Sequence, residues 1–144
     1  MSDAADAAIR RPVQTHGAPA ALVILLVEDE AAFRELLESV LSAAGHAVHA
    51  AADGQAALQL LAQHRIDIIV TDLCMPGKDG MEFLMALRSK RSPVPVIAMS
   101  GGVGSNMAGL LRTAELLGAS CTLAKPFALP SLLAAVAAVA HSGR

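Results

Sequence analysis

Five short aliphatic runs alternate along the chain with five longer segments in which apolar residues recur at helical spacing. The runs cover residues 22–27, 46–51, 66–70, 94–99 and 120–124. The first is a continuous stretch of Leu, Val and Ile without polar alternation, which is typical of a strand buried on both faces of a parallel sheet. The pattern therefore predicts five strands, each followed by a helix.

The ends of the predicted helices carry recognisable signals. Asp53 stands at the N-cap position before the second helix, and Asp79 and Glu82 have the spacing of a capping box before the third. Gly45 and Gly118 follow the segments 33–44 and 106–117, where a glycine commonly ends a helix. The spacing predicts inner faces that include Leu58, Leu61 and Ala62; Met81, Leu84 and Leu87; and Leu129, Leu132, Leu133, Val136 and Ala140, with Ala134, Ala135, Ala138 and His141 on the outer face of the last helix.

Strict alternation of strands and helices indicates an α/β fold with a parallel sheet covered by helices on both faces. Right-handed crossovers restrict this arrangement to a doubly wound sandwich. Ligands of such sheets bind beyond the carboxyl ends of the strands. The residues that follow each predicted strand are therefore the candidates for function.

Charged and hydroxyl side chains stand at these strand ends. Glu28 and Asp29 follow the first run, Asp72 the third, Ser100 the fourth and Lys125 the fifth. Three carboxylates gathered at one edge repel one another unless a cation is present, and oxygen ligands suit a hard cation such as Mg2+. With an ammonium and a hydroxyl nearby, one carboxylate could attack phosphorus as a nucleophile.

Four motifs at these positions resemble the receiver domain of two-component response regulators. They are residues 27–30 (Val-Glu-Asp-Glu), Thr71-Asp72 with the turn that follows, residues 98–101 (Ala-Met-Ser-Gly) and Lys125-Pro126-Phe127. The resemblance covers about residues 22–141. It implies a flavodoxin-like fold with strand order 2-1-3-4-5 and a cis peptide bond before Pro126.

The resemblance also implies a role for each site residue. Asp72 would be the phosphoacceptor, and Lys125 and Ser100 would bind the phosphoryl group. Mg2+ would be held by Asp29, Asp72 and the main-chain carbonyl of Cys74, with Glu28 assisting through water. The donor would be a sensor histidine kinase or a histidine phosphotransfer protein, and a downstream protein would read the signal.

The sequence departs from the family pattern at several positions, among them Glu28, which stands where the family usually has Asp. Thr122 stands three residues before Lys125, where the family often has a switching Tyr or Phe. We hypothesise that ordering of the glycine-rich segment 100–105 replaces that aromatic switch. Cys74 and Gly102 lack the amide or carboxylate that could orient an attacking water, which predicts slow self-dephosphorylation. Beyond its own phosphorylation and this slow dephosphorylation, the resemblance implies no enzymatic activity.

Composition narrows the function classes further. The chain has 144 residues, 54% of them hydrophobic, with a formal net charge of −2, which disfavours disorder and a nucleic-acid partner. It contains no Trp or Tyr to sandwich a flavin, so a flavodoxin-like electron carrier is disfavoured. Cys74 and Cys121 lie far apart in sequence and the five histidines are scattered, which argues against a disulfide framework or a zinc site.

The chain ends add expectations about organisation. We expect a mobile extension over residues 1–20 and a stand-alone receiver domain over 21–142, which signals by altered protein contacts. A signal peptide is disfavoured because the apolar run 18–27 ends in Glu28, Asp29 and Glu30. No apolar run is long enough to span a bilayer, so a cytoplasmic protein without membrane contact is expected. It would be a monomer or a weak dimer through the last two helices and the fifth strand.

Other interpretations of the same residues stay open. Glu28, Asp29 and Glu30 could be only an acidic first helical turn, and an aspartyl-phosphate phosphatase would carry a D-x-D motif at this place. A receiver-like module that binds its partner without phosphorylation is a further alternative. Arg88, Lys90 and Arg91 are better explained as favourable charges at a helix end than as a binding patch.

Overall fold

The five predicted strands form one parallel sheet. The computed structural model describes residues 21–75, 79–101 and 107–142. Its strands are β1 (Val23–Val27), β2 (Ala47–Ala51), β3 (Ile68–Asp72), β4 (Val96–Ser100) and β5 (Cys121–Ala124). They pair in parallel in the order β2-β1-β3-β4-β5. This confirms the doubly wound, flavodoxin-like topology.

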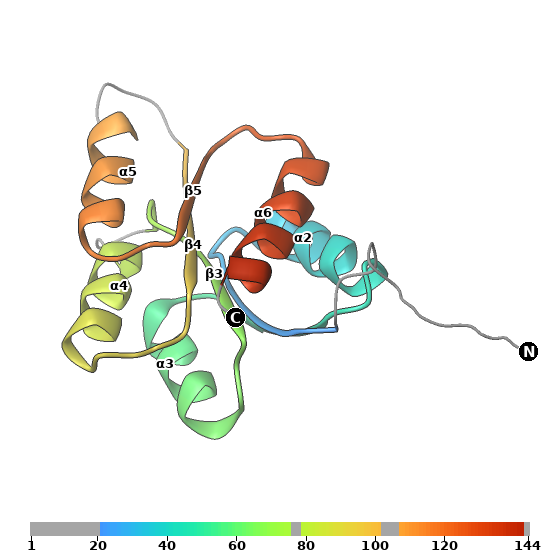
Figure 1. Ribbon diagram of the computed structural model, residues 1–144, viewed down its shortest axis with the longest axis horizontal. Helices are drawn as coiled ribbons and strands as arrows, with labels where there is room; N and C mark the ends of the chain where they lie inside the picture. The colour runs from blue at the N-terminus through green and yellow to red at the C-terminus, as the bar shows by residue number, and fades with distance from the viewer. Residues whose placement is uncertain (1–20, 76–78, 102–106, 143–144) are drawn as a thin grey trace, which may run out of the picture.

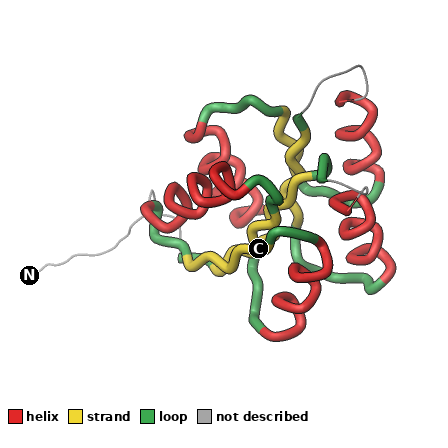
Figure 2. The backbone as a smooth tube through the Cα atoms, turned by 180° about the vertical axis from the view of Figure 1, so that it is seen from behind, coloured by secondary structure: helices red, strands yellow, loops and turns green. Residues whose placement is uncertain are grey.

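Helices cover both faces of the sheet. They are α2 (Ala31–Ala43), α3 (Gly54–Gln63), α4 (Asp79–Ser89), α5 (Met107–Leu116) and α6 (Leu129–Ser142). In Figure 1, α3, α4 and α5 stand on one side of the strands, and α2 and α6 on the other. Figure 2 shows the same two groups of helices from behind, with the strands between them. Among the described residues, no helix is both long and apolar enough to cross a membrane.

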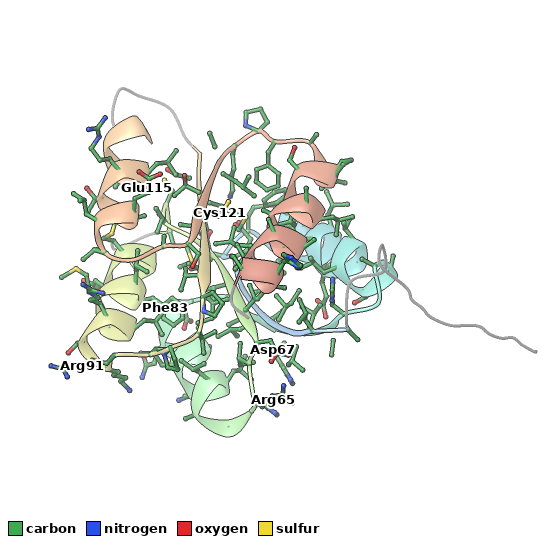
Figure 3. All side chains as sticks on the ribbon, in the orientation of Figure 1. Arg65, Asp67, Phe83, Arg91, Glu115 and Cys121 are labelled. Atoms are coloured by element: carbon green, nitrogen blue, oxygen red, sulfur yellow. The ribbon has the colours of Figure 1, made fainter. Side chains whose placement is uncertain are left out.

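The sheet separates two hydrophobic cores, because neighbouring residues of a strand point to opposite faces. In β1, Leu25 and Val27 belong to the core under α3, α4 and α5, whereas Ile24 and Leu26 belong to the core under α2 and α6. The first core also holds Phe83 of α4, which Figure 3 shows pointing toward the sheet. The continuous aliphatic run of β1 thus follows from burial on both sides.

Two strands end later than the sequence predicts. The third was expected over residues 66–70 and runs from Ile68 to Asp72, and the fourth was expected over 94–99 and runs from Val96 to Ser100. Both polar residues continue the main-chain ladder, since Leu73 N donates to Met99 O (2.8 Å) and Lys125 N donates to Ser100 O (2.8 Å). Asp72 and Ser100 are therefore fixed strand residues and not loop residues.

Three expectations about helix faces are wrong. Ala62 is exposed, and Ala57 is the fully buried alanine of α3. Ala135 of α6 is buried, whereas the spacing predicts it on the outer face. Leu36 of α2 shares the helical spacing of the apolar residues in segment 33–44, which predicts it on the inner face, but it is 46% exposed. In each helix the buried face differs by part of a turn from the inner face that the apolar spacing predicts. Side-chain packing against the sheet decides which residues point inward.

The predicted helix ends are mostly confirmed. Gly45 (φ 98°) and Gly118 (φ 100°) have the left-handed conformation expected after a helix, and Asp53 accepts a hydrogen bond from Ala56 N at 2.7 Å. The first helix begins at Ala31, two residues earlier than predicted, because Glu30 is its N-cap. The side chain of Asp79, on which the predicted capping box depends, and the segment 102–106 lie outside what the structure describes.

Side chains also fix the start of β1. His46 Nδ1 accepts a hydrogen bond from Leu22 N (3.1 Å), and Asp67 Oδ2 accepts one from Val23 N (2.8 Å). Burial of His46 lowers the pKa of its imidazole, so the neutral form is the acceptor here. Figure 3 shows Asp67 beside Arg65, with which it forms an ion pair.

Candidate functional site

An acidic cluster lies at the carboxyl ends of β1 and β3. Glu28 and Asp29 directly follow β1, and Asp72 is the last residue of β3. One carboxylate oxygen from each of these residues lies within 4.8 Å of the others. The fold therefore brings together the three carboxylates that the sequence analysis singled out.

Lys125, directly after β5, joins two of these carboxylates. Its Nζ donates to Glu28 Oε1 and to Asp72 Oδ2, each at 2.9 Å. Partial burial lowers the pKa of the Lys125 ammonium, but the hydrogen bonds to Glu28 and Asp72 outweigh this effect and leave the pKa raised. The lysine is therefore a permanent positive charge that offsets part of the acidic cluster.

The carboxylate of Asp72 is held at both oxygens. Its Oδ1 accepts a hydrogen bond from the main-chain N–H of Cys74 (2.9 Å), while its Oδ2 faces Lys125. The residue is only 3% exposed. Gly80, at the start of α4, allows this arrangement, because a Cβ there would overlap the main-chain carbonyl of Asp72. Asp72 therefore has one fixed orientation at the end of its strand.

Glu28 is buried more deeply than either of its acidic neighbours. Its side chain is 1% exposed, and its Oε2 accepts a hydrogen bond from Glu30 N at 3.1 Å. Burial raises the pKa of the Glu28 carboxyl, and the charge of Asp72 raises it further, against the lowering effect of Lys125 and of the Glu30 amide. Asp29, in contrast, is exposed.

Two residues that support this cluster were not assigned such a role from the sequence. Glu30 is the N-cap of α2, and its carboxylate accepts a hydrogen bond from Phe33 N (2.7 Å). The Arg34 guanidinium donates to the main-chain carbonyl of Glu28 (2.9 Å) and also reaches that of Asp29 (3.4 Å). The only signal for Arg34 was its place one turn into the helix that follows the acidic residues.

Ser100 lies at the carboxyl end of β4 and is fully buried. Its hydroxyl is 3.3 Å from the thiol sulfur of Cys74. The main chain of Ser100 pairs with Lys125, and a Cβ on the next residue, Gly101, would come within 2.5 Å of the Lys125 Cβ. The glycine thus gives the lysine side chain the space to cross toward Asp72.

A pocket of about 650 Å³ opens over Asp72 and Lys125. Its walls combine charged and aromatic side chains. The peptide bond between Lys125 and Pro126, two of the lining residues, is cis, as expected. Thr122 of β5 is not part of the lining. The residues that line it are Glu30, Phe33, Asp72, Cys74, Gly101, Lys125, Pro126 and Phe127.

Fold and site together define the class of the protein. It is a flavodoxin-like α/β domain whose sheet carries, at the carboxyl edge of its strands, an acidic pocket with a lysine that contacts two of the carboxylates. The family model of the response regulator receiver domain matches residues 24–137. The chain therefore belongs to the receiver domains of response regulators in two-component systems.

Individual relatives agree with this assignment. Response regulator MprA of Mycolicibacterium vanbaalenii is 41% identical over 118 residues, which are 81% of this chain and 49% of the relative. The chain thus spans about half the length of the curated relatives it matches. Full-length FixJ from B. japonicum is 32% identical (TM-score 0.77, 85% of this chain and 59% of FixJ), and the receiver domain of the Francisella response regulator 1452 is 25% identical (TM-score 0.76, 85% and 99%).

Proposed function

We propose that this chain accepts a phosphoryl group on Asp72 from a phosphohistidine of a sensor kinase or a histidine phosphotransfer protein. The observation that carries the proposal is the placement of the Asp72 carboxylate at the wall of an open pocket, between the Cys74 N–H and the Lys125 ammonium. A carboxylate oxygen of Asp72 forms the new bond to phosphorus. The P–N bond of the donor breaks, and the bonding electrons leave with the imidazole, which takes up a proton.

The donor set of the acidic cluster fits a Mg2+ ion. Carboxylate oxygens are the ligands that this hard cation prefers, and three lie within 4.8 Å of one another. Asp29 and Asp72 would hold the ion together with the main-chain carbonyl of Cys74, and Glu28 would assist through water. When bound, the ion supplies positive charge against the phosphoryl oxygens.

Lys125 and Ser100 would complete the binding of the phosphoryl group. The Lys125 ammonium already contacts the reacting carboxylate, so it can follow the negative charge from Asp72 to a phosphoryl oxygen. The Ser100 hydroxyl lies 3.3 Å from the thiol sulfur of Cys74, which lines the pocket, and would supply a hydrogen-bond donor. Both groups are fixed by the main-chain pairing of β4 with the segment after β5.

The output would be a change in protein contacts. We propose that residues 21–142 form the receiver domain of a cytoplasmic protein, with α5, β5 and α6 as its surface for a downstream protein or a weak dimer. The aromatic residue that often switches this surface in the family is replaced here by Thr122. How the segment 102–106 responds lies outside the described residues and stays a prediction.

Intact-mass measurement after incubation with acetyl phosphate and Mg2+ tests the proposal. We expect one labile phosphoryl adduct that is absent in Asp72→Asn and in samples with EDTA. Asp53→Asn is the matched control, because Asp53 is an exposed N-cap and asparagine caps a helix equally well. An adduct that persists in Asp72→Asn, or no adduct on the unmodified chain, would overturn the proposal, and turnover of a phosphate ester would indicate a phosphatase.

A further inference from the structure

Two of the three aromatic side chains of this protein stand at the pocket. The sequence contains three Phe and neither Trp nor Tyr. Phe33 of α2 and Phe127, directly before the last helix, both line the pocket, with ring centroids 6.1 Å apart and planes at 61°. Phe83 lies in the core on the opposite face of the sheet. Both pocket rings therefore share the wall that also holds Asp72.

The ring of Phe33 lies against the charged end of Lys125. The Nζ atom is 4.7 Å from the ring centroid. A cation at this distance from an aromatic face is attracted by the negative charge on that face. The ammonium is therefore bounded by two carboxylates, Glu28 and Asp72, and by one aromatic ring.

The position of Phe33 is fixed by its surroundings. Its main-chain N–H donates to the N-cap carboxylate of Glu30 at 2.7 Å, and the next residue, Arg34, donates to the carbonyl of Glu28. The ring packs edge to face with Phe127 and against the core under α2 and α6. Helix, acidic segment and second ring thus hold the Phe33 side chain in one place before any ligand arrives.

We propose that Phe33 is a positioning residue for Lys125. During phosphoryl uptake the ammonium exchanges its contact with Asp72 for one with a phosphoryl oxygen. The aromatic face attracts the ammonium without requiring a directed hydrogen bond, so it keeps Lys125 inside the pocket throughout this exchange. An aliphatic residue of similar size would fill the space but would not attract the charge. This inference rests on the proposed function, because the exchange occurs only if Asp72 is phosphorylated.

The rate of phosphoryl uptake tests this role. We expect Phe33→Leu to take up phosphoryl from acetyl phosphate about three- to tenfold more slowly, which is about 0.6–1.4 kcal/mol in the barrier and lies within the range of a cation–π contact. Phenylalanines with one, two or five ring fluorines, placed at position 33 through a suppressed stop codon, weaken the attraction while nearly preserving the shape. The rate should fall in the order of fluorine number, whereas a merely space-filling role predicts equal rates.

A spectroscopic measurement on the unmodified chain supplies an independent test. The sequence has three lysines, Lys78, Lys90 and Lys125, so protein labelled only in lysine gives few signals. We expect the methylene protons next to the Lys125 ammonium to be shifted upfield by the ring of Phe33, relative to those of exposed Lys90, and to lose this shift in Phe33→Leu.

The outcomes separate the two proposals. Absence of any adduct on the unmodified chain overturns the proposed function, whatever Phe33 does. Normal uptake together with no upfield shift of Lys125, or with equal rates across the fluorinated series, overturns the role of Phe33 alone. If Phe33→Leu fails to fold, the fluorinated series and the lysine spectrum still decide the question.

Discussion

Replacing Lys125 by methionine should destabilise the protein when no divalent cation is present. The ammonium is the shared partner of Glu28 and Asp72, whose side chains are 1% and 4% exposed. Methionine keeps the unbranched chain that passes over Gly101 and removes only the charge and the hydrogen-bond donors. The two carboxylates would then remain buried, close together and without this cation.

The distances set the size of the effect. At 2.9 Å and an effective dielectric constant of about 20, each pair attracts with about 6 kcal/mol before any costs are counted. Desolvation and the repulsion between Glu28 and Asp72 offset most of this attraction. Removal of one partner from a buried pair costs about 3–5 kcal/mol. Because the Lys125 side chain is 22% exposed, we expect a loss near the lower end, about 3 kcal/mol.

Urea unfolding followed by circular dichroism measures this loss, since the chain has no Trp or Tyr for fluorescence. The comparison is made near neutral pH with EDTA. Lys90→Met is the matched control, because Lys90 is exposed beyond the end of α4. We expect the control to stay within about 0.5 kcal/mol of the unmodified protein. A loss below about 1 kcal/mol in Lys125→Met would refute the reasoning.

The pH dependence gives a second check on the same variant. Burial raises the pKa of Glu28 above its ordinary value even with Lys125 present, and Lys125 is one of the groups that lower it. A carboxyl with a raised pKa in the folded state favours folding at low pH, and this contribution is lost as the pH rises through the folded pKa. The deficit of Lys125→Met should therefore shrink as the pH falls from neutral toward the ordinary pKa of Glu. A deficit independent of pH would contradict this account, and added Mg2+ should restore part of the stability.

Three further predictions follow from single contacts. Burial lowers the pKa of the His46 imidazole below 6.5, so the contribution of this residue to the free energy of unfolding is complete above that pH and is lost as the pH falls toward the folded pKa. His46→Gln keeps an acceptor for Leu22 N but cannot be protonated in this range. Urea unfolding at a series of pH values should therefore show a smaller loss of stability on the acid side for this variant. Gly101→Ala should slow phosphoryl uptake about tenfold with an unchanged fold by circular dichroism, because the new methyl group displaces Lys125. Cys74→Asn should shorten the lifetime of the phosphoryl adduct about tenfold by adding an amide that can orient water, as followed by decay of the intact-mass adduct; a lifetime of seconds in the unmodified chain would contradict the expected slow loss.

The sequence predicts the fold well because burial leaves a direct pattern in it. The run of β1 is aliphatic at every position since Ile24 and Leu25 face different cores, and this cannot be mistaken for an amphipathic element. Strand ends are harder to predict. The pattern places the polar residues Asp72 and Ser100 after the strands, yet their main chains pair with neighbouring strands. A side-chain pattern carries no information about a main-chain partner.

In the site, too, some residues can be predicted from the sequence and others cannot. Parallel strands bring their carboxyl ends to one edge of the sheet, so a residue that follows one strand lies near the residues that follow the others. For this reason the sequence alone indicates the cluster of Glu28, Asp29, Asp72 and Lys125. Phe33 was recognised only as an apolar position of a helix. Its contact with Lys125 depends on how α2 is rotated against the sheet, which the sequence leaves open, as the exposure of Leu36 on the same helix also shows.

The charges at the site indicate that Lys125 alone would not prepare Asp72 for the proposed reaction. Three carboxylates and one ammonium leave a formal charge of −2 within the cluster, and the incoming phosphoryl group is itself an anion. Burial, and to a lesser extent the charge of Asp72, raises the pKa of Glu28, the member of the cluster that solvent reaches least. A divalent cation would balance the remaining charge, whereas a second lysine would have to be buried beside the first. The geometry therefore favours a site whose affinity for the phosphoryl group depends on a cation, and Glu28→Gln, which removes one negative charge, should weaken Mg2+ binding while leaving the contact of Lys125 with Asp72 in place.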